Sequence, residues 1–225
     1  MSGKLHIVAT PIGNLQDITL RALEVLKSVE VIFCEDTRHS LKLLNHYGIQ
    51  KPLVSLHAHN EAKRLGLILK HLEQGKSLAM ISDAGTPLIS DPGFRTVQGV
   101  LEAGYEVDSL PGPCAAINAL VMSGMPSEGF FFVGFLPAKS AARLRFFEKW
   151  KDFPYTLIFY ESPHRIEKFL VEAHRVFADR QVFLSREMTK KFAENYRGPL
   201  HPALVDYPMR SWKGEFVVVL KGADE

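Results

Sequence analysis

The segment of this chain with the most unusual chemistry runs from Ile81 to Gly93 and reads ISDAGTPLISDPG. It places two carboxylates, several hydroxyls, glycines and prolines directly behind an apolar run at 78–81. In an α/β protein, a strand that ends in such a loop before a helix is a usual ligand site, because glycines let main chain approach a bound molecule and prolines fix the loop. An ordinary turn, with Asp91 capping a helix that begins at Pro92, explains the second half. It does not explain DAGTP at 83–87, which predicts a ligand-facing role.

Four further polar segments follow other apolar runs of the first half of the chain. They are TPIGN at 10–14, EDTRH at 35–39, HAHNE at 57–61 and PGPCAA at 111–116. The connections between helices and the following strands, such as 48–52 and 74–77, are plain turns by comparison. Because the carboxyl ends of parallel strands meet at one edge of a sheet, this asymmetry predicts a ligand site at that edge.

The elements that would position these segments alternate regularly. Apolar runs predict strands at 5–9, 31–34, 53–56, 78–81 and 106–110, and apolar residues three and four apart predict helices at 19–29, 40–47, 61–74 and 92–103. Gly48, Gly75 and Gly104 each follow a helical stretch, where a left-handed C-cap is expected. This βαβ order predicts an α/β fold with a mainly parallel sheet and helices on both faces.

A turn-rich segment, SGMPSEG at 123–129, predicts a boundary between two α/β domains, residues 1–123 and residues 124–225. In the second domain we expect strands at 130–134, 156–160, 181–185 and 215–220, with helices at 140–151 and 163–177. YESPHR at 160–165 and REMTKK at 186–191 follow two of these strands. Both mix carboxylates with cations, which permits either structural ion pairs or chemistry.

The basic helix of the second domain also has two interpretations. Its cations are Lys139, Arg143, Arg145, Lys149 and Lys151. They form either a solvated helix face or a patch that contacts RNA phosphates. The net charge of the chain is only +2, so a nucleic-acid partner would have to be held by such a local patch.

Composition and spacing argue against several other classes of protein. Cys34 and Cys114 are the only cysteines among 225 residues, which is untypical of a disulfide framework and suits the reducing cytoplasm. His57 and His59 alternate across an extended segment and cannot easily share a metal, so no metal site is predicted. No apolar run approaches the ~20 residues needed to cross a bilayer. We therefore expect a cytoplasmic protein with no membrane partner.

Taken together, the loops resemble the tetrapyrrole methylase superfamily and, within it, are similar to the 16S ribosomal RNA cytidine 2′-O-methyltransferase family. The matching stretches are IVATPIGNL at 7–15, EDTRH at 35–39, SDAGTPLISDPG at 82–93, LPGP at 110–113, YESPHR at 160–165, REMTK at 186–190 and KGE at 213–215. The resemblance covers almost the whole chain. SDAGTP stands in place of the Gly-Asp-Pro pattern of the porphyrin and corrin enzymes, which favours the RNA branch.

The resemblance implies two α/β domains with S-adenosylmethionine bound in the cleft between them, in a homodimer that methylates a cytidine in the decoding centre of the small ribosomal subunit. By motif, the implied cofactor-binding residues are Pro11, Ile12, Asp83, Gly85, Thr86, Cys114, Ala115, Ser185, Glu187, Gly214 and Glu215. Two departures matter. Cys114 stands where a serine or threonine is common, and the chain ends soon after Leu220, where many members of the family continue.

Methyl transfer from a sulfonium requires that the acceptor oxygen be aligned with the methyl carbon and that water be excluded. A ribose 2′-hydroxyl is a poor nucleophile, so a general base or a nearby cation should help. The candidates are Asp36 or Glu187 as base, with Arg38 and Lys190 as cations near the ribose or an adjacent phosphate. Two rival functions stay open: methylation of a carbon or nitrogen of a tetrapyrrole, and a non-catalytic ribosome-binding factor.

Overall fold

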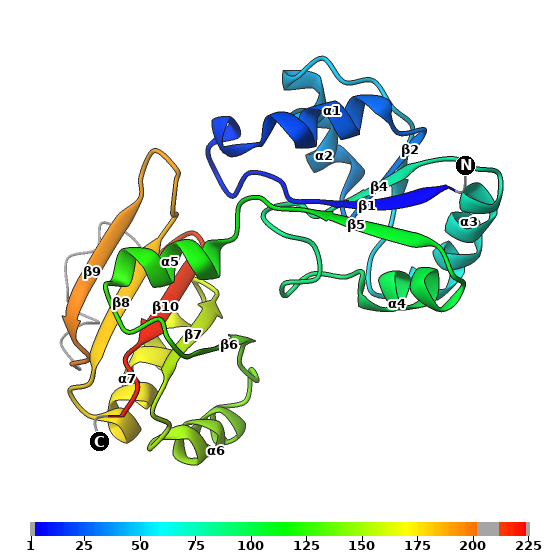
Figure 1. Cartoon of the computed structure of the whole chain (residues 1–225). Coiled ribbons are helices and arrows are strands. Elements are labelled where there is room, and N and C mark those ends of the chain that lie inside the picture. Colours follow the sequence, from blue (N-terminus) through cyan, green and yellow to red (C-terminus); the bar gives the residue numbers. More distant parts are fainter. Residues whose placement is uncertain (1–2, 202–211, 224–225) are drawn as a thin grey trace. The chain divides into compact units, whose positions relative to one another are not determined.

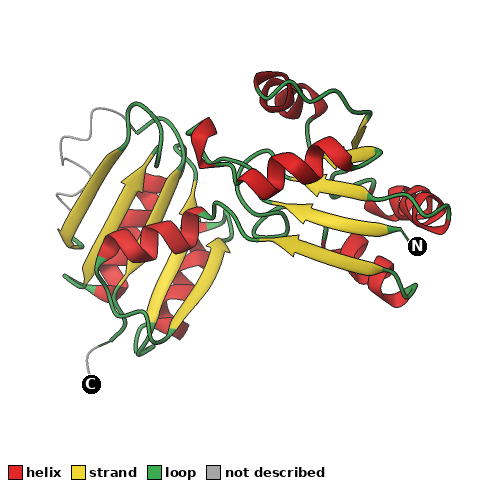
Figure 2. Cartoon of the chain, turned by 45° about the horizontal axis from the view of Figure 1, so that its top comes forward, coloured by secondary structure: helices red, strands yellow, loops and turns green. Residues whose placement is uncertain are grey.

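The computed structural model describes residues 3–201 and 212–223, and the chain divides into two compact units, Met1–Cys114 and Ala115–Glu225 (Figure 1). Each unit is a five-stranded sheet with helices packed on both of its faces (Figure 2). Among the described residues, no helix is both long and apolar enough to span a bilayer. The α/β class predicted for both units is confirmed.

The first unit contains a sheet in the order β3-β2-β4-β1-β5, and all of its pairings are parallel. Its strands are β1 (Lys4–Val8), β2 (Val31–Cys34), β3 (Leu53–Ser55), β4 (Leu78–Ile81) and β5 (Glu106–Leu110). Every residue of β2 and β4 is buried, as expected for inner parallel strands that are covered on both faces. The parallel sheet predicted from the alternation of apolar runs is therefore confirmed.

Helices cover the two faces of this sheet in pairs. They are α1 (Leu20–Ser28), α2 (Thr37–His46), α3 (Glu61–Glu73) and α4 (Phe94–Glu102), with a 3-10 turn η1 (Leu15–Asp17) before α1. Ile32 and Cys34 pack in one core cluster with residues of α1 and α2, whereas Phe33 packs in the other with residues of α3 and α4. This alternation follows from the period of two along a strand. Gly48, Gly75 and Gly104 have φ values of +64°, +75° and +80°, which confirms the predicted C-caps.

The predicted start of α4 is wrong. The helix begins at Phe94, with Gly93 at the N-cap position and a φ of +128°, rather than at Pro92 with Asp91 as the cap. The buried carboxylate of Glu61, at the start of α3, accepts hydrogen bonds from Gly93 N (3.1 Å) and Thr96 N (3.1 Å). The cap comes from another helix, so rules based on local spacing cannot find it.

The second unit contains a mixed sheet in the order β6-β7-β10-β8-β9. Its strands are β6 (Phe130–Phe135), β7 (Thr156–Glu161), β8 (Gln181–Arg186), β9 (Glu194–Pro199) and β10 (Phe216–Leu220). β6 and β7 are parallel, and β10 and β9 run antiparallel to their neighbours. The edge strand β9 was not predicted, because its sequence ENYRGP is polar and ends in proline, as edge strands can.

Three helices pack on this second sheet: α5 (Ala115–Ser123), α6 (Ser140–Trp150) and α7 (Ile166–Phe177). Residues of α6 and α7 share a core cluster with one face of the sheet. α5 packs against β10, β7 and β8, and buries Ala116, Ala119 and Leu120 (Figure 1). The division between the units therefore lies before α5. The turn-rich segment at 123–129 predicted a boundary after α5 instead. That segment connects α5 to β6 within the second unit.

Candidate functional site

Hydrogen bonds tie together three of the loops that follow strands of the first unit. Thr10, after β1, and Gly85, after β4, form an isolated antiparallel bridge, with N–O distances of 2.9 and 3.0 Å. The Thr10 hydroxyl also donates to Ser82 O at 3.1 Å. The Thr86 hydroxyl donates to Pro113 O, after β5, at 2.9 Å. Three of the segments that the sequence singled out therefore meet at the carboxyl edge of the parallel sheet, as predicted.

Glycine is needed at two points of close approach among these loops. Gly85 has a φ of +82°, and a Cβ there would lie 3.3 Å from Ile12 Cγ2. A Cβ on Gly112 would lie 2.7 Å from Ala9 Cβ, which is closer than side-chain carbons pack. The glycines thus let the loops after β1, β4 and β5 approach one another closely.

Backbone strain is concentrated in two of the predicted segments. Five non-glycine residues of the described chain have a positive φ. Two of them, Leu88 (+73°) and Ser90 (+66°), lie in the loop after β4, and two others, Glu187 (+51°) and Thr189 (+66°), follow β8. Such conformations persist only where the surrounding structure holds them, and they are common at functional sites.

Asp83, Asp36 and Arg38 form one connected group in the first unit. The Asp36 N–H donates to Asp83 Oδ1 at 3.1 Å, which joins the loops after β2 and β4. Asp36 is the N-cap of α2, which begins earlier than predicted: its Oδ1 accepts from Arg38 N at 2.8 Å, and its Oδ2 accepts from Arg38 Nη2 at 3.1 Å. The Arg38 side chain, then its backbone N–H, lowers the pKa of Asp36 to about 2. This candidate base is therefore a weak one.

A second group surrounds Lys190 in the second unit. Its Nζ donates to Glu187 Oε1 at 2.7 Å and to Glu215 Oε2 at 2.9 Å, and Glu215 N donates to Glu187 Oε1 at 3.0 Å. A Cβ on Gly214, whose φ is +103°, would lie 2.5 Å from Glu187 Cγ, so only glycine permits this approach. The predicted residues Glu187, Lys190, Gly214 and Glu215 are therefore brought together.

The pKa values of this second group are set by opposing effects. Burial raises the pKa of Glu187, but hydrogen bonds from the Lys190 ammonium and from Glu215 N, together with the Lys190 charge, hold it below its ordinary value. Burial lowers the pKa of Lys190, but its hydrogen bonds to Glu187 and Glu215 raise it by more. Near neutral pH, Glu187 is thus ionised and Lys190 is protonated, and the ammonium group is held at a fixed position between the Glu187 and Glu215 carboxylates.

The last two residues of β8, Ser185 and Arg186, directly precede this group in the chain. Arg186 is buried, and its guanidinium bonds Glu194 Oε2 (3.0 Å), Phe192 O (2.9 Å) and Lys213 O (3.0 Å), which holds the following loop in place. The buried hydroxyl of Ser185 has no hydrogen-bond partner within the described part of the chain. An orphaned buried hydroxyl at a predicted binding residue is the kind of group that a polar ligand satisfies.

The remaining predicted cofactor residues lie at the junction of the units and after β1. Pro11 is buried, Ile12 is half-buried, and Cys114 and Ala115, both half-buried, stand on either side of the division between the units. The next residue, Ala116, donates its N–H to the Tyr160 hydroxyl at 3.0 Å. The site residues therefore form two groups, one within each unit. Thr10 and Ser82, which tie the first group together, were missed because their role depends on a partner far along the chain.

Two interpretations were given for the YESPHR segment, structural ion pairs or chemistry, and its contacts favour a structural ion pair. Glu161 is buried and accepts from Arg165 Nε at 2.7 Å, from Arg165 Nη2 at 2.9 Å and from Ser162 N at 2.7 Å. Arg165 also donates to Leu136 O at 3.0 Å, beyond the end of β6. The ion pair of Glu161 and Arg165 joins β6, β7 and the start of α7, so the contacts of these two side chains are made within the fold.

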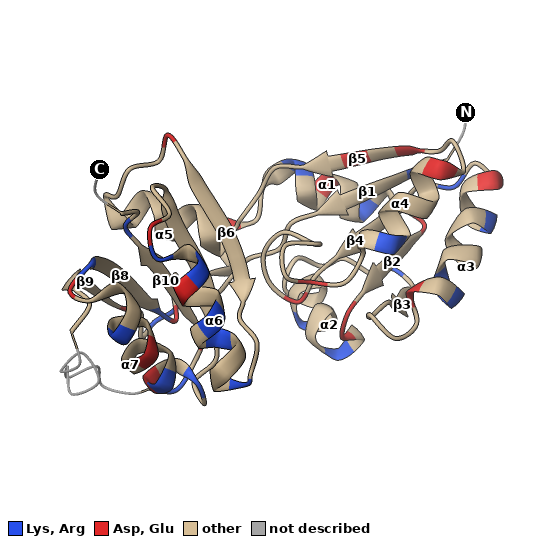
Figure 3. Cartoon of the chain, turned by 90° about the horizontal axis from the view of Figure 1, so that it is seen from below, with Lys and Arg blue, Asp and Glu red and all other residues tan. Residues whose placement is uncertain are grey.

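One of the cations predicted to contact phosphates from the basic helix α6 is not at the surface. Arg143 is buried and forms an ion pair with Glu172 of α7, so it cannot reach RNA, and that part of the prediction is wrong. The buried carboxylate requires this cation. Figure 3 shows the charged positions along α6. Arg145 and Lys149 within the helix, and Lys139 and Lys151 at its two ends, are exposed.

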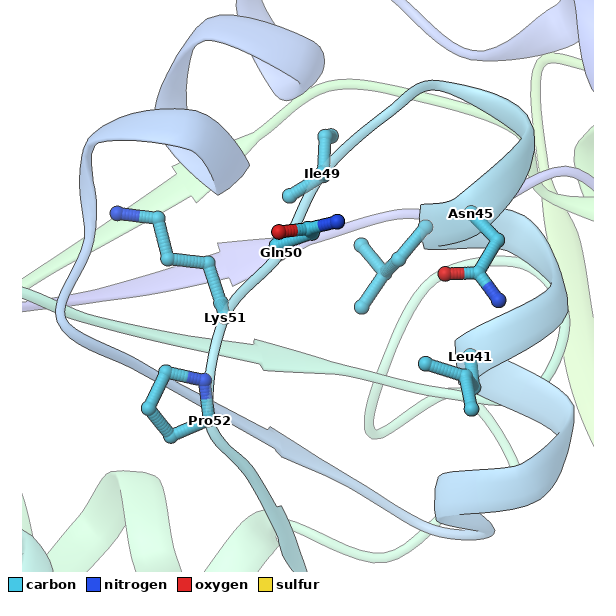
Figure 4. Close-up of a pocket in the computed structure, with 7 residues that line it drawn as sticks. Leu41, Asn45, Ile49, Gln50, Lys51 and Pro52 are labelled. Atoms are coloured by element: carbon cyan, nitrogen blue, oxygen red, sulfur yellow. The ribbon is translucent and has the colours of Figure 1, made fainter.

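A surface hollow of about 340 Å³ lies away from these groups. It is lined by Leu41, Leu44, Asn45, Ile49, Gln50, Lys51 and Pro52 (Figure 4). These residues belong to the end of α2 and the connection to β3, which is the amino edge of the parallel strands. None of them is a predicted site residue, and ligands of such sheets bind at the opposite edge. Among the described residues, no group of three or more His, Cys, Asp or Glu side chains could hold a metal ion.

The fold and its strand-end loops define a known class of enzyme. A family model described as Tetrapyrrole (Corrin/Porphyrin) Methylases matches residues 4–203, and the chain belongs to this family of methyltransferases. It is 51% identical to Ribosomal RNA small subunit methyltransferase I of Haemophilus influenzae, over 99% of this chain and 80% of that protein. It is 45% identical to the protein of the same name from Thermotoga maritima, over 99% of this chain and 100% of that protein.

A solved structure shows the same fold at low identity. Uroporphyrin-III C-methyl transferase from Thermus thermophilus, complexed with S-adenyl homocysteine, matches with a TM-score of 0.65 and 18% identity, over 96% of this chain and 97% of that chain. The resemblance to the tetrapyrrole methylase superfamily is confirmed, and the similarity to the ribosomal RNA methyltransferases confirms the branch that the SDAGTP loop favoured.

Proposed function

We propose that this chain transfers a methyl group from S-adenosylmethionine to the ribose 2′-oxygen of a cytidine in 16S rRNA, in the decoding centre of the small ribosomal subunit. The observation that carries this proposal is the 51% identity, over nearly the whole chain, to a protein named Ribosomal RNA small subunit methyltransferase I. The assembled strand-end loops support an active enzyme rather than a non-catalytic relative. Because the substrate is ribosomal, we place the reaction in the cytoplasm.

The residues of the two groups fit this methyl donor. Asp83 uses Oδ1 for Asp36 N, and its Oδ2 makes no hydrogen bond to any described residue, so it is available to a hydroxyl or an ammonium group. Gly85 lets the loops after β1 and β4 come together through its hydrogen bonds with Thr10, and the buried Ser185 hydroxyl lacks a partner among the described residues. We assign cofactor contacts to Pro11, Ile12, Asp83, Gly85, Thr86 and Cys114 in the first unit and to Ala115, Ser185, Glu187, Gly214 and Glu215 in the second. When bound, S-adenosylmethionine supplies an electrophilic methyl group on a positive sulfur.

The four candidate catalytic residues divide by charge. Asp36 and Glu187 already accept hydrogen bonds from Arg38 and Lys190, and the pKa of each carboxyl is lowered by its partner. They therefore hold the two cations in place. Arg38 and Lys190 supply positive charge to the ribose oxygen or to an adjacent phosphate, where developing negative charge needs it.

Recognition of RNA is supported by an exposed aromatic residue beside Lys190. Phe192 is 62% exposed, and Lys191 Nζ lies 5.6 Å from its ring centroid. Arg186 fixes the main chain at Phe192, so the ring is presented on an ordered segment. Unpaired RNA bases are commonly stacked on such aromatic rings, with a nearby cation for the phosphate.

The assembly that we propose is a homodimer. Val121 of α5 is 74% exposed, and Phe135 of β6 is exposed as well, so the second unit offers apolar surface that a second copy would bury. Light scattering of the purified protein tests this: a monomeric mass at the working concentration contradicts it.

The experiment that tests the function is tritiated methyl transfer from S-adenosylmethionine into small ribosomal subunits and into naked 16S rRNA, with the modified nucleotide mapped. Label confined to one cytidine 2′-oxygen is the expected result. Methylation of a tetrapyrrole precursor without transfer to either RNA substrate would establish the rival enzyme. Absence of S-adenosylmethionine binding by calorimetry would establish the non-catalytic factor.

A further inference from the structure

Neither Asp36 nor Glu187 is a suitable base to remove the proton of the 2′-hydroxyl, because each carboxylate is already hydrogen-bonded to a cation. Glu35 stands next to Asp36, directly after β2, and is half-buried. Its carboxylate makes no hydrogen bond within the part of the chain that the structure describes. We propose that Glu35 is the general base that accepts the proton of the 2′-hydroxyl during methyl transfer. This inference rests on the proposed function.

The pairing of the strands places Glu35 between the loops after β3 and β4. Cys34, the last residue of β2, pairs with Ser55 of β3 and with Ile81 of β4. Leu56 N donates to Cys34 O at 2.8 Å, so the chains after β2 and β3 stay side by side past the ends of the strands. Glu35 therefore lies at the carboxyl edge of the sheet, among the loops to which we assign the cofactor.

The main chain directly after Glu35 is held firmly. The Asp36 N–H is bonded to Asp83 Oδ1 at 3.1 Å, and the Asp36 side chain caps α2. A base must be kept within reach of the proton it removes, and a fixed backbone meets that requirement. Asp36 thus acts as a positioning residue for Glu35 as well as a partner of Arg38.

The titratable groups that act on Glu35 come from three loops: Asp83 after β4, His57 after β3 and the neighbouring Asp36. His57 is itself held in place, because Asn60 Oδ1 accepts from His57 N at 2.9 Å and Asn60 Nδ2 lies 3.0 Å from His57 Nε2. Burial raises the pKa of Glu35, and the Asp83 charge raises it further, against the opposite effect of His57. Since the pKa of Asp36 is only about 2, Glu35 is the stronger base of the two.

The step balances without another reactant. The 2′-oxygen passes its proton to the Glu35 carboxylate and forms a bond to the methyl carbon. The carbon–sulfur bond breaks with its electron pair remaining on sulfur, which becomes a neutral thioether. Glu35 then releases the proton to solvent. The base must be ionised, so the methylation rate should rise with pH through the pKa of Glu35 and level off above it.

The test compares Glu35→Gln with wild type and with Glu30→Gln, an exposed glutamate just before β2 at the opposite end of that strand. In single-turnover assays on small ribosomal subunits, E35Q should lose about 10²–10⁴-fold in rate, whereas E30Q should retain the wild-type rate. Calorimetry should show that E35Q binds S-adenosylmethionine within about threefold of wild type. An E35Q enzyme that methylates at the wild-type rate overturns the assignment.

A further measurement needs no turnover. Carbon-13 NMR titration of labelled glutamate should show one resonance, absent from E35Q, that titrates above the ordinary glutamate range. A Glu35 resonance that titrates at or below that range overturns the proposal; if E35Q does not fold, the resonance is assigned by its absence from Glu35→Asp. In that case Glu35→Asp also supplies the rate test, because its shorter side chain holds the carboxylate out of reach of the same proton. An E35D rate and pH profile identical to those of wild type also overturn the proposal. If the wild-type protein methylates no RNA, that result refutes the proposed function, whereas the titration of Glu35 is measured independently of it.

Discussion

Glu61 stabilises the start of α4 from a different helix, and its removal should be costly. Its buried carboxylate accepts from Gly93 N, Thr96 N and the Thr96 hydroxyl, at 3.1, 3.1 and 3.3 Å. Loss of an N-cap costs about 1 kcal/mol, and leaving the buried donors of Gly93 and Thr96 without an acceptor adds about 2 kcal/mol. Glu61→Ala should therefore lower the free energy of unfolding by about 3 kcal/mol. Glu61→Gln keeps one acceptor and should lower it by about 1.5 kcal/mol.

Urea unfolding followed by circular dichroism measures both values, with Glu73→Gln, an exposed position at the end of the same helix, as the control. The loop from 81 to 93 ends at this cap, so E61Q should also weaken S-adenosylmethionine binding by about tenfold. Adding Thr96→Val should cost less in E61A than in wild type, because the two residues share one interaction. An E61A protein within about 0.5 kcal/mol of wild type would refute the capping role.

Three other changes have defined outcomes. Gly85→Ala forces a side chain into a φ of +82° and should lower the free energy of unfolding by about 1–2 kcal/mol, as measured by urea titration; an unchanged midpoint would contradict the need for glycine. The folded pKa of Asp36, about 2, lies below its ordinary value of 3.8, so its contribution to stability is present at neutral pH and is lost as pH falls from about 4 to 2. Asp36→Asn should remove that part of the pH dependence of unfolding, and an identical acid profile would argue against the Arg38 contact. Lys190→Ala should reduce single-turnover methylation by about 10²-fold, and a wild-type rate would exclude a role for its charge.

Local physics made much of this protein predictable from its sequence. Continuous apolar runs identified the strands of the first sheet, and Gly48, Gly75 and Gly104 ended their helices where a positive φ was needed. The polar segments after the strands predicted the site edge, because parallel strands bring their carboxyl ends together whatever the details of packing. These properties depend on residues close together in the chain.

The tertiary structure decided what depends on partners far apart in the chain. Arg143 was expected at the surface because it lies in a basic helix, but it is buried against Glu172. The carboxylate of Glu61 caps α4, although the sequence had suggested the nearby Asp91 as the cap. Asp36 and Glu35 are adjacent carboxylates in the sequence, yet one is bound to Arg38 and the other has no hydrogen-bond partner among the described residues. The sequence determined which loops lie at the carboxyl edge of the first sheet. Only the packing of those loops decided which of their charges are neutralised within the fold and which are left for chemistry.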